Sequence, residues 1–154
     1  GTERFFQLCA ESGVDGVIVP DLPYEEQDEI QDAAGQAGVY SISMVAPTSH
    51  ERIAMIASAA KGFLYCVSST GVTGTRKEFT TDFDAFFDTI RQSAHIPCAV
   101  GFGISGPEQA KAISAYCDGV IIGSAIVKMV AESGKDCVEP VGRFTASLRK
   151  ALDS

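Results

Sequence analysis

The chain has 154 residues, with 20 Asp or Glu against 12 Lys or Arg, so its formal net charge is −8. Hydrophobic residues make up 45% and charged residues 21%, which excludes a disordered chain and suits one globular domain over residues 1–154. The acidic balance without a Lys/Arg cluster argues against a nucleic acid or an anionic membrane as partner. No apolar run approaches the roughly 20 residues that span a bilayer. The five cysteines show neither a disulfide framework nor metal-ligand spacing, so we expect a cytoplasmic protein with reduced thiols.

Short apolar runs alternate along the chain with longer amphipathic stretches. Each run is continuously hydrophobic, which is typical of strands buried on both faces of a parallel sheet. The runs cover residues 16–20, 39–45, 63–67, 98–101 and 119–122.

Helix signals in the first part of the chain fall before and between these runs. The chain opens in a helix, and Pro23 followed by two acids starts the next helix, which Gly38 ends. Thr48 and Glu51 have the spacing of a capping box, so His50 is expected to be a helix-start residue.

The later helices are indicated by periodicity and by proline. The segment from Thr81 has apolar residues at i, i+3, i+4 and i+7, which predicts one face in the core. These residues are Phe83, Phe86, Phe87 and Ile90. An early proline and an acid within residues 105–108 begin another helix, and two more are expected from Ser124 and about Val138.

The resulting pattern is a helix, five βα units and one terminal helix. The βαβ order requires right-handed parallel crossovers, which leaves an open doubly wound sheet or part of a (βα)8 barrel. A complete barrel typically needs about 250 residues, so this chain is too short for one.

The five cysteines have an odd count, and no two of them form a C-x-x-C pair. We expect them to be reduced core residues, because metal sites and disulfide frameworks need closer or paired spacings. They are Cys9, Cys66, Cys98, Cys117 and Cys137.

The last two predicted strand ends favour a phosphate site. Gly123 and Ser124 follow the run 119–122 at the start of a helix, where free N–H groups and the helix dipole attract anions. Gly103 follows the preceding run, where backbone can approach a ligand closely. Taken singly, the glycines could be tight-turn residues and Ser124 only an N-cap. The G-x-G-x-x-G match at 101–106 is weaker as a dinucleotide signal, because Pro107 follows it.

The remaining strand ends carry fewer signals. The loop 68–78 is long for a βα connection and could be a lid. Tyr65 ends the strand before it, so its hydroxyl either faces the site or is buried and satisfied. Asp21 is the carboxylate best placed for proton transfer, but no acid–base pair and no metal-ligand spacing accompanies it.

Four blocks of the sequence together resemble the tryptophan synthase α subunit family. They are residues 19–26, 69–74, 101–109 and 123–128, in that family's order. The resemblance implies a (βα)8 TIM barrel, of which this chain would be an incomplete part made of βα units 4–8. It also implies a lyase of tryptophan biosynthesis without cofactor or metal. The family reaction is retro-aldol cleavage of indole-3-glycerol phosphate to indole and glyceraldehyde 3-phosphate. Indole then passes to a β subunit.

The resemblance also assigns roles to individual residues. Phosphate binding would fall to Gly74, Gly103, Gly123 and Ser124. Tyr65 would line the site, Phe102 would contact the indole, and Thr73 would lie on a mobile lid. Asp21 and Pro23 would face the β subunit. Ser69 departs from the pattern, since many family members have Arg there.

The family's catalytic Glu and Asp would lie upstream of Gly1, so we expect this chain to be inactive alone. A sheet cut from a barrel would leave two unpaired edges, which predicts self-association. Two alternatives stay open: a non-catalytic phosphate-binding half-barrel module, and another phosphate-using barrel enzyme.

Overall fold

The computed structural model describes residues 1–67, 83–101 and 103–154. The predictions for Ser69, Thr73, Gly74, Phe102 and the loop 68–78 therefore lie outside the described residues. The strands are β1 (Gly16–Val17), β2 (Tyr40–Ser41), β3 (Met44–Val45), β4 (Leu64–Val67), β5 (Cys98–Gly101) and β6 (Gly119–Ile121). The α-helices are α1 (Thr2–Glu11), α2 (Asp28–Ala37), α3 (His50–Ala59), α4 (Phe83–Ser93), α5 (Pro107–Ser114), α6 (Ser124–Ser133) and α7 (Val138–Leu152). Two short 3-10 helices are η1 (Tyr24–Glu26) and η2 (Gly134–Asp136).

All strand pairs in the described residues are parallel, and within each of the two sheets every strand pairs with its neighbour along the chain. β1 pairs with β2, and β3 to β6 form a second sheet in the order β3-β4-β5-β6. The predicted strand 39–45 is thus two short strands, which corrects the sequence prediction. The backbone changes partner between them, because Ile42 N donates to Val17 O whereas Tyr65 N donates to Ser43 O. The five predicted strand positions therefore lie in consecutive order.

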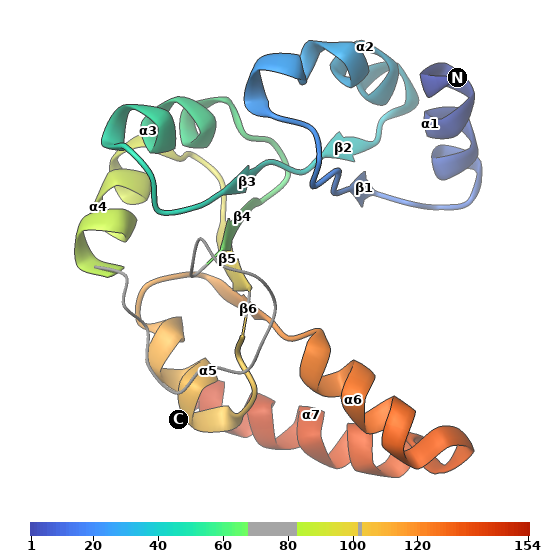
Figure 1. Ribbon diagram of the computed structural model, residues 1–154, viewed down its shortest axis with the longest axis vertical. Helices are drawn as coiled ribbons and strands as arrows, with labels where there is room; N and C mark the ends of the chain where they lie inside the picture. The colour runs from blue at the N-terminus through green and yellow to red at the C-terminus, as the bar shows by residue number, and fades with distance from the viewer. Residues whose placement is uncertain (68–82, 102) are drawn as a thin grey trace.

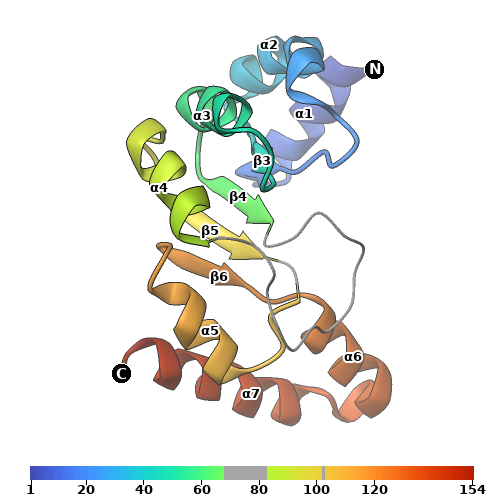
Figure 2. The same cartoon turned by 60° about the vertical axis from the view of Figure 1, so that its left-hand side comes forward.

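Helices cover one face of the larger sheet and form the main core with it (Figures 1 and 2). Leu64, Cys66 and Val100 are fully buried on this face, as expected for strands beneath a helix layer. The helices contribute Ile53, Ile56, Phe86, Phe87, Ile90, Ile113 and Leu148. A smaller cluster joins α1 and α2 to the first strands through Phe6, Ala34 and Val39.

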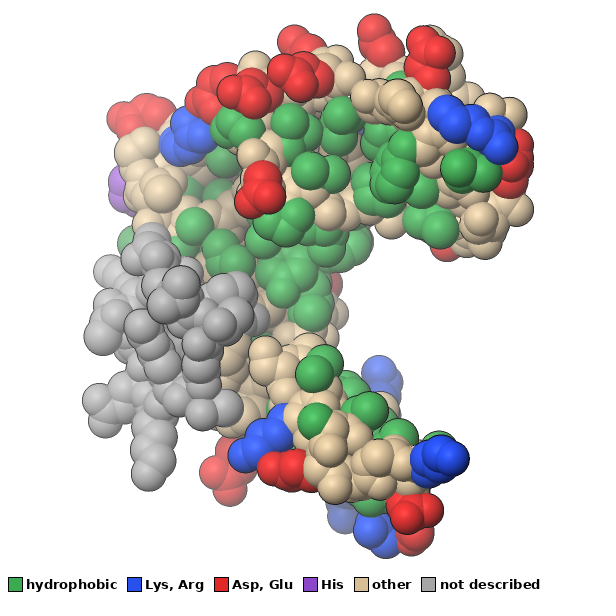
Figure 3. Space-filling model, turned by 45° about the vertical axis from the view of Figure 1, so that its right-hand side comes forward, with side chains coloured by type: hydrophobic (Ala, Val, Ile, Leu, Met, Phe, Trp, Pro, Cys, Tyr) green, Lys and Arg blue, Asp and Glu red, His purple; other side chains and the backbone are tan. Residues whose placement is uncertain are grey.

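The opposite face of the larger sheet is not covered by these helices and forms the inner face of the fold. The parallel register places Tyr65, Ala99 and Gly119 in one row across it and Val67, Gly101 and Ile121 in the next. Figure 3 shows the molecule hollowed between the region of α1 and α2 and the arm formed by α6 and α7, with hydrophobic side chains gathered beside the hollow. Helices outside and parallel strands inside give the arrangement of an incomplete (βα)8 barrel, as predicted.

Most of the predicted helices are confirmed, with two corrections at their starts. The cap of α3 is Ser49, whose Oγ accepts from Arg52 N at 3.3 Å, so the capping box based on Thr48 is wrong by one residue. The helix expected from Pro23 begins instead with the 3-10 turn η1. Gly38 ends α2 in the left-handed conformation at φ 70°, as predicted.

Four of the five cysteines lie in the core clusters or pack against them, as expected, whereas Cys137 belongs to neither cluster. All five cysteines are free thiols, and Cys66 and Cys98 are buried in the main core. Within residues 1–67, 83–101 and 103–154, no group of His, Cys, Asp or Glu side chains could hold a metal ion. Among the same residues, no helix is both long and apolar enough to cross a membrane.

Candidate functional site

The carboxyl ends of β4, β5 and β6 lie side by side. Val67, Gly101 and Ile121 are register partners across these three strands. Gly103 comes two residues after β5 and Gly123 two residues after β6, so the loops that carry them leave adjacent strand ends. In parallel α/β folds this edge of the sheet is where ligands bind.

The start of α6 presents free backbone donors. Gly123 is the N-cap and Ser124 the first helical residue, and no side chain in the described part of the chain caps the N–H groups of the first turn. The turn contains no acidic residue, and a Cβ placed on Gly123 would meet no heavy atom within 4 Å. The interpretation of Ser124 as only an N-cap is therefore wrong, because Gly123 holds that position. The open, uncapped turn suits an anion.

Residues 103–105, which follow β5, are fixed by packing in the core and by hydrogen bonds to the start of α5. Gly103 has φ 82°, a left-handed conformation that favours glycine. Ile104 is 4% exposed and packs in the main core. The Ser105 backbone N–H and hydroxyl both donate to Gln109 Oε1 at 2.9 Å. Sequence reasoning missed Gln109, although its i, i+4 spacing from Ser105 at a helix start was a usable signal.

Tyr65 lies across Gly101 on the inner face of the sheet. A Cβ built on Gly101 would overlap the Tyr65 hydroxyl and would lie 2.7 Å from Cε1 of the ring. The absence of a side chain at Gly101 thus leaves the space that the Tyr65 ring occupies. The sequence analysis did not assign this role. The Tyr65 phenol can act as a hydrogen-bond donor at neutral pH, and its partial burial raises its pKa further.

Asp21 and Pro23 lie in the segment after β1, away from the α6 start in the chain. Asp21 is exposed in a turn closed by Leu22 N donating to Val19 O at 3.1 Å. Its carboxylate makes no hydrogen bond or ion pair within the described part of the chain. Pro23 precedes η1 with φ −68° and ψ 158°.

A cavity of about 210 Å³ separates this segment from the end of β3. Its lining includes Pro23, Ala46 and Arg52, but neither Tyr65 nor the glycines of the candidate phosphate site. The Arg52 guanidinium donates to both carboxylate oxygens of Glu25, at 2.6 and 3.1 Å, and so ties η1 to α3. This side-chain bond lowers the pKa of Glu25. Sequence reasoning missed the pair because 27 residues separate its partners.

A family model described as "Tryptophan synthase alpha chain" matches residues 1–153. The chain belongs to the tryptophan synthase alpha chain family. It is 44% identical over 154 residues to the alpha chain of Thermoanaerobacter sp. (strain X514), covering 99% of this chain and 59% of that protein. The alpha chain of Geobacillus kaustophilus is 50% identical over 130 residues, covering 84% of this chain and 48% of that protein.

Solved structures in this family share the fold. The tryptophan synthase a2b2 complex from Pyrococcus furiosus matches with a TM-score of 0.86 at 32% identity, over 97% of this chain and 61% of that chain. The alpha subunit of Legionella pneumophila str. Paris matches with a TM-score of 0.79 at 33% identity, over 99% and 57%. The chain thus spans 48–59% of the length of these two curated alpha chains, and its fold is that of part of the family's barrel.

Proposed function

We propose that this chain supplies the phosphate-binding side of an alpha-chain active site that cleaves indole-3-glycerol phosphate to indole and glyceraldehyde 3-phosphate. One observation carries the proposal: Gly103 and the uncapped α6 start at Gly123 and Ser124 emerge from adjacent strand ends. Backbone N–H groups there can bind a phosphate without competition from a side chain. Gly74 completes the proposed phosphate site from the family resemblance.

The indole side of the substrate is assigned to the neighbouring strand ends. Tyr65 projects on the inner face of the sheet, and its position over Gly101 supports a role in lining the site. Phe102 would contact the indole ring, and Thr73 would lie on the lid that covers it. Both assignments rest on the family resemblance.

The reaction breaks the carbon–carbon bond between indole C3 and the glycerol chain. A proton must reach C3 while the adjacent carbinol hydroxyl loses its own proton to become the aldehyde. Each positioned acid–base group contributes on the order of 10²–10⁴-fold. We assign these groups to the part of alpha chains that lies outside these 154 residues. On this proposal the 154-residue polypeptide binds phosphate without turning over substrate.

The exposed turn after β1 is proposed as a contact with the β subunit. Asp21 and Pro23 are both exposed, which leaves them available to a partner. The related protein from Pyrococcus furiosus was solved as an a2b2 complex, which supports a β subunit as that partner.

The test is indole release from indole-3-glycerol phosphate by the chain, alone and mixed with the N-terminal two-fifths of the Thermoanaerobacter alpha chain. We expect no release by the chain alone and release by the mixture. Ser124→Glu places a negative charge in the phosphate site and should raise KM at least about tenfold, whereas Ser147→Glu on α7 should not.

Three other outcomes of this test would each favour a different conclusion. Activity of the chain alone would refute the assignment of the acid–base groups and direct attention to Asp21. An inactive mixture that still binds glycerol 3-phosphate at Gly103 and Ser124 would favour the non-catalytic binding module. Binding of other sugar phosphates with turnover would favour a different barrel enzyme.

A further inference from the structure

A second cavity lies on the outer side of the fold, between α2 and the segment that links α3 to β4. Its volume is about 250 Å³. It is separate from the candidate phosphate site, because its lining contains none of Tyr65, Gly103, Gly123 or Ser124. Neither the proposed function nor the family resemblance assigns it a role.

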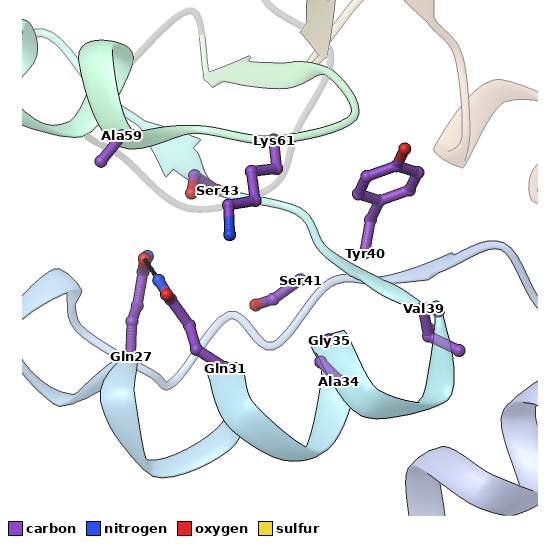
Figure 4. A pocket seen from close by; sticks show the side chains of 11 residues that line it. Gln27, Gln31, Ala34, Gly35, Val39, Tyr40, Ser41, Ser43, Ala59 and Lys61 are labelled. Carbon is purple, nitrogen blue, oxygen red and sulfur yellow. Dashed lines mark hydrogen bonds between the residues drawn. The ribbon is translucent and has the colours of Figure 1, made fainter.

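Polar groups from three parts of the chain converge in this cavity. Figure 4 shows the ends of Gln27 at the N-cap of α2 and Gln31 on α2, the Ser41 and Ser43 hydroxyls and the Lys61 ammonium directed toward one space. Lys61 is the one charged side chain among the described residues that line the cavity. It makes no ion pair or hydrogen bond within residues 1–67, 83–101 and 103–154. An unneutralised ammonium above a concave surface favours an anion.

Ser43 provides an independent indication of a ligand. Ser43 is 5% exposed and is the only buried polar residue among the described residues. No described group forms a hydrogen bond with its hydroxyl. No fully enclosed side-chain oxygen or nitrogen among the described residues lacks a partner. The Ser43 hydroxyl must therefore open onto the cavity that it lines. A hydroxyl withdrawn from bulk water and pointed into a cavity is suited to donate to a bound oxygen.

The lining has an excess of donors. The ammonium offers three N–H donors and the two serines offer one O–H each. The Gln31 Nε2 donates to Gln27 Oε1 at 3.5 Å, so one amide oxygen is already engaged. The apolar side chains of the wall are those of Ala34, Val39 and Ala59, and Gly35, Gly38 and Tyr40 complete the described lining. A ligand that satisfies both parts has an oxyanion at one end and a short apolar body at the other.

We propose that this cavity is a binding site for a small organic anion, a carboxylate or a phosphate monoester. The oxyanion lies between Lys61 and the Ser43 hydroxyl, and the apolar body lies against Ala34 and Val39. The volume falls just below the roughly 300–1,000 Å³ of pockets for drug-sized ligands, which restricts the occupant to a small metabolite. The site acts independently of the proposed lyase reaction.

The test uses the 154-residue chain, labelled with ¹⁵N and titrated at constant ionic strength. Inorganic phosphate and benzoate are the two probes, so the experiment separates a phosphate ligand from a carboxylate with an apolar body. At least one probe should cause saturable shifts in the amide signals of Gln31, Ser43 and Lys61. Sodium chloride at the same ionic strength should not.

Three variants test the residues. Lys61→Met keeps the apolar stem and should weaken binding by about tenfold or more, because it removes the positive charge that would face the bound anion. Gly35→Leu should also weaken binding, since a Cβ there meets no heavy atom within 4 Å and the side chain would occupy open space beside the cavity. Lys150→Met removes an exposed charge from α7 and is the matched control, with binding changed less than about twofold.

Two results would overturn the proposal. One is the absence of saturable shifts with both probes. The other is equal binding by the parent chain and Lys61→Met while the variant keeps a dispersed, folded spectrum. Phosphate that shifts only Gly103, Gly123 and Ser124 would support the proposed function and still overturn this second site, so the two failures are distinguishable.

Discussion

The contact between Tyr65 and Gly101 gives the sharpest test of the structure. In Gly101→Ala the new methyl group would overlap the Tyr65 hydroxyl and lie 2.7 Å from Cε1. Either the ring or the strand must move, and overpacking of this kind costs about 1–3 kcal/mol. For a chain of this size, that corresponds to a fall in Tm of about 2–12 °C.

A double-mutant cycle separates this clash from a general intolerance of alanine. Tyr65→Leu removes the hydroxyl, Cζ and Cε1 atoms that the methyl would meet. In that background Gly101→Ala should change the free energy of unfolding by less than about 0.5 kcal/mol, or stabilise slightly through reduced chain entropy. The coupling between the two substitutions should therefore be at least about 1 kcal/mol.

The chain also provides a matched glycine. Gly119 lies on the same face one strand away, and a Cβ there would be 3.7 Å from the Ala99 Cβ, an ordinary contact. Gly119→Ala should be neutral or stabilising in urea unfolding followed by circular dichroism. A Gly101→Ala effect as small as that of Gly119→Ala would refute the predicted clash. So would an effect of the same size with and without the tyrosine.

Three further predictions follow from other contacts. Ser49→Ala should destabilise the chain by about 0.5–2 kcal/mol in urea unfolding, because it removes the α3 cap. Thr48→Ala should have little effect. A larger loss of stability with Thr48→Ala than with Ser49→Ala would instead support the capping box based on Thr48. Asp118 Oδ2 accepts a hydrogen bond from Cys98 N at 2.8 Å. Asp118→Ala should therefore lower the free energy of unfolding by about 1–3 kcal/mol and speed amide hydrogen exchange at Cys98. Unchanged exchange at Cys98 would contradict this contact. Because burial raises the pKa of Tyr65 above its unfolded value, the protonated phenol favours the folded state, and this contribution is lost as the pH rises from about 10 through the folded pKa. Tyr65→Phe should therefore lessen the decline of unfolding free energy above about pH 10, and an unaltered decline would count against the shift.

Much of the fold could be predicted because it depends on neighbours along the chain. Continuous apolar runs placed the strands, since a strand covered on both faces needs apolar residues at every position. The i, i+3, i+4, i+7 spacing predicted the core face of α4, and Phe86, Phe87 and Ile90 are buried as expected. Gly38 ends a helix because its left-handed φ is favourable for glycine.

The candidate phosphate site was also predictable in outline. A strand that runs directly into a helix leaves the first N–H groups of that helix free, so Gly123 and Ser124 could be singled out without coordinates. Which of the two residues is the N-cap required the structure, because the choice depends on backbone angles rather than residue type alone. The roles of Thr73, Gly74 and Phe102 remain predictions.

The contacts that only the tertiary structure decided join residues far apart in sequence. The run 39–45 splits because its two halves hydrogen-bond to different strands, and nothing within the run marks the change. Tyr65 meets Gly101, and Arg52 meets Glu25, through strand register and helix packing. The sequence by itself therefore determined the elements, their order and the family, since these follow from local spacing and short motifs. Register and packing placed the side chains, because they arise from contacts that no local pattern contains.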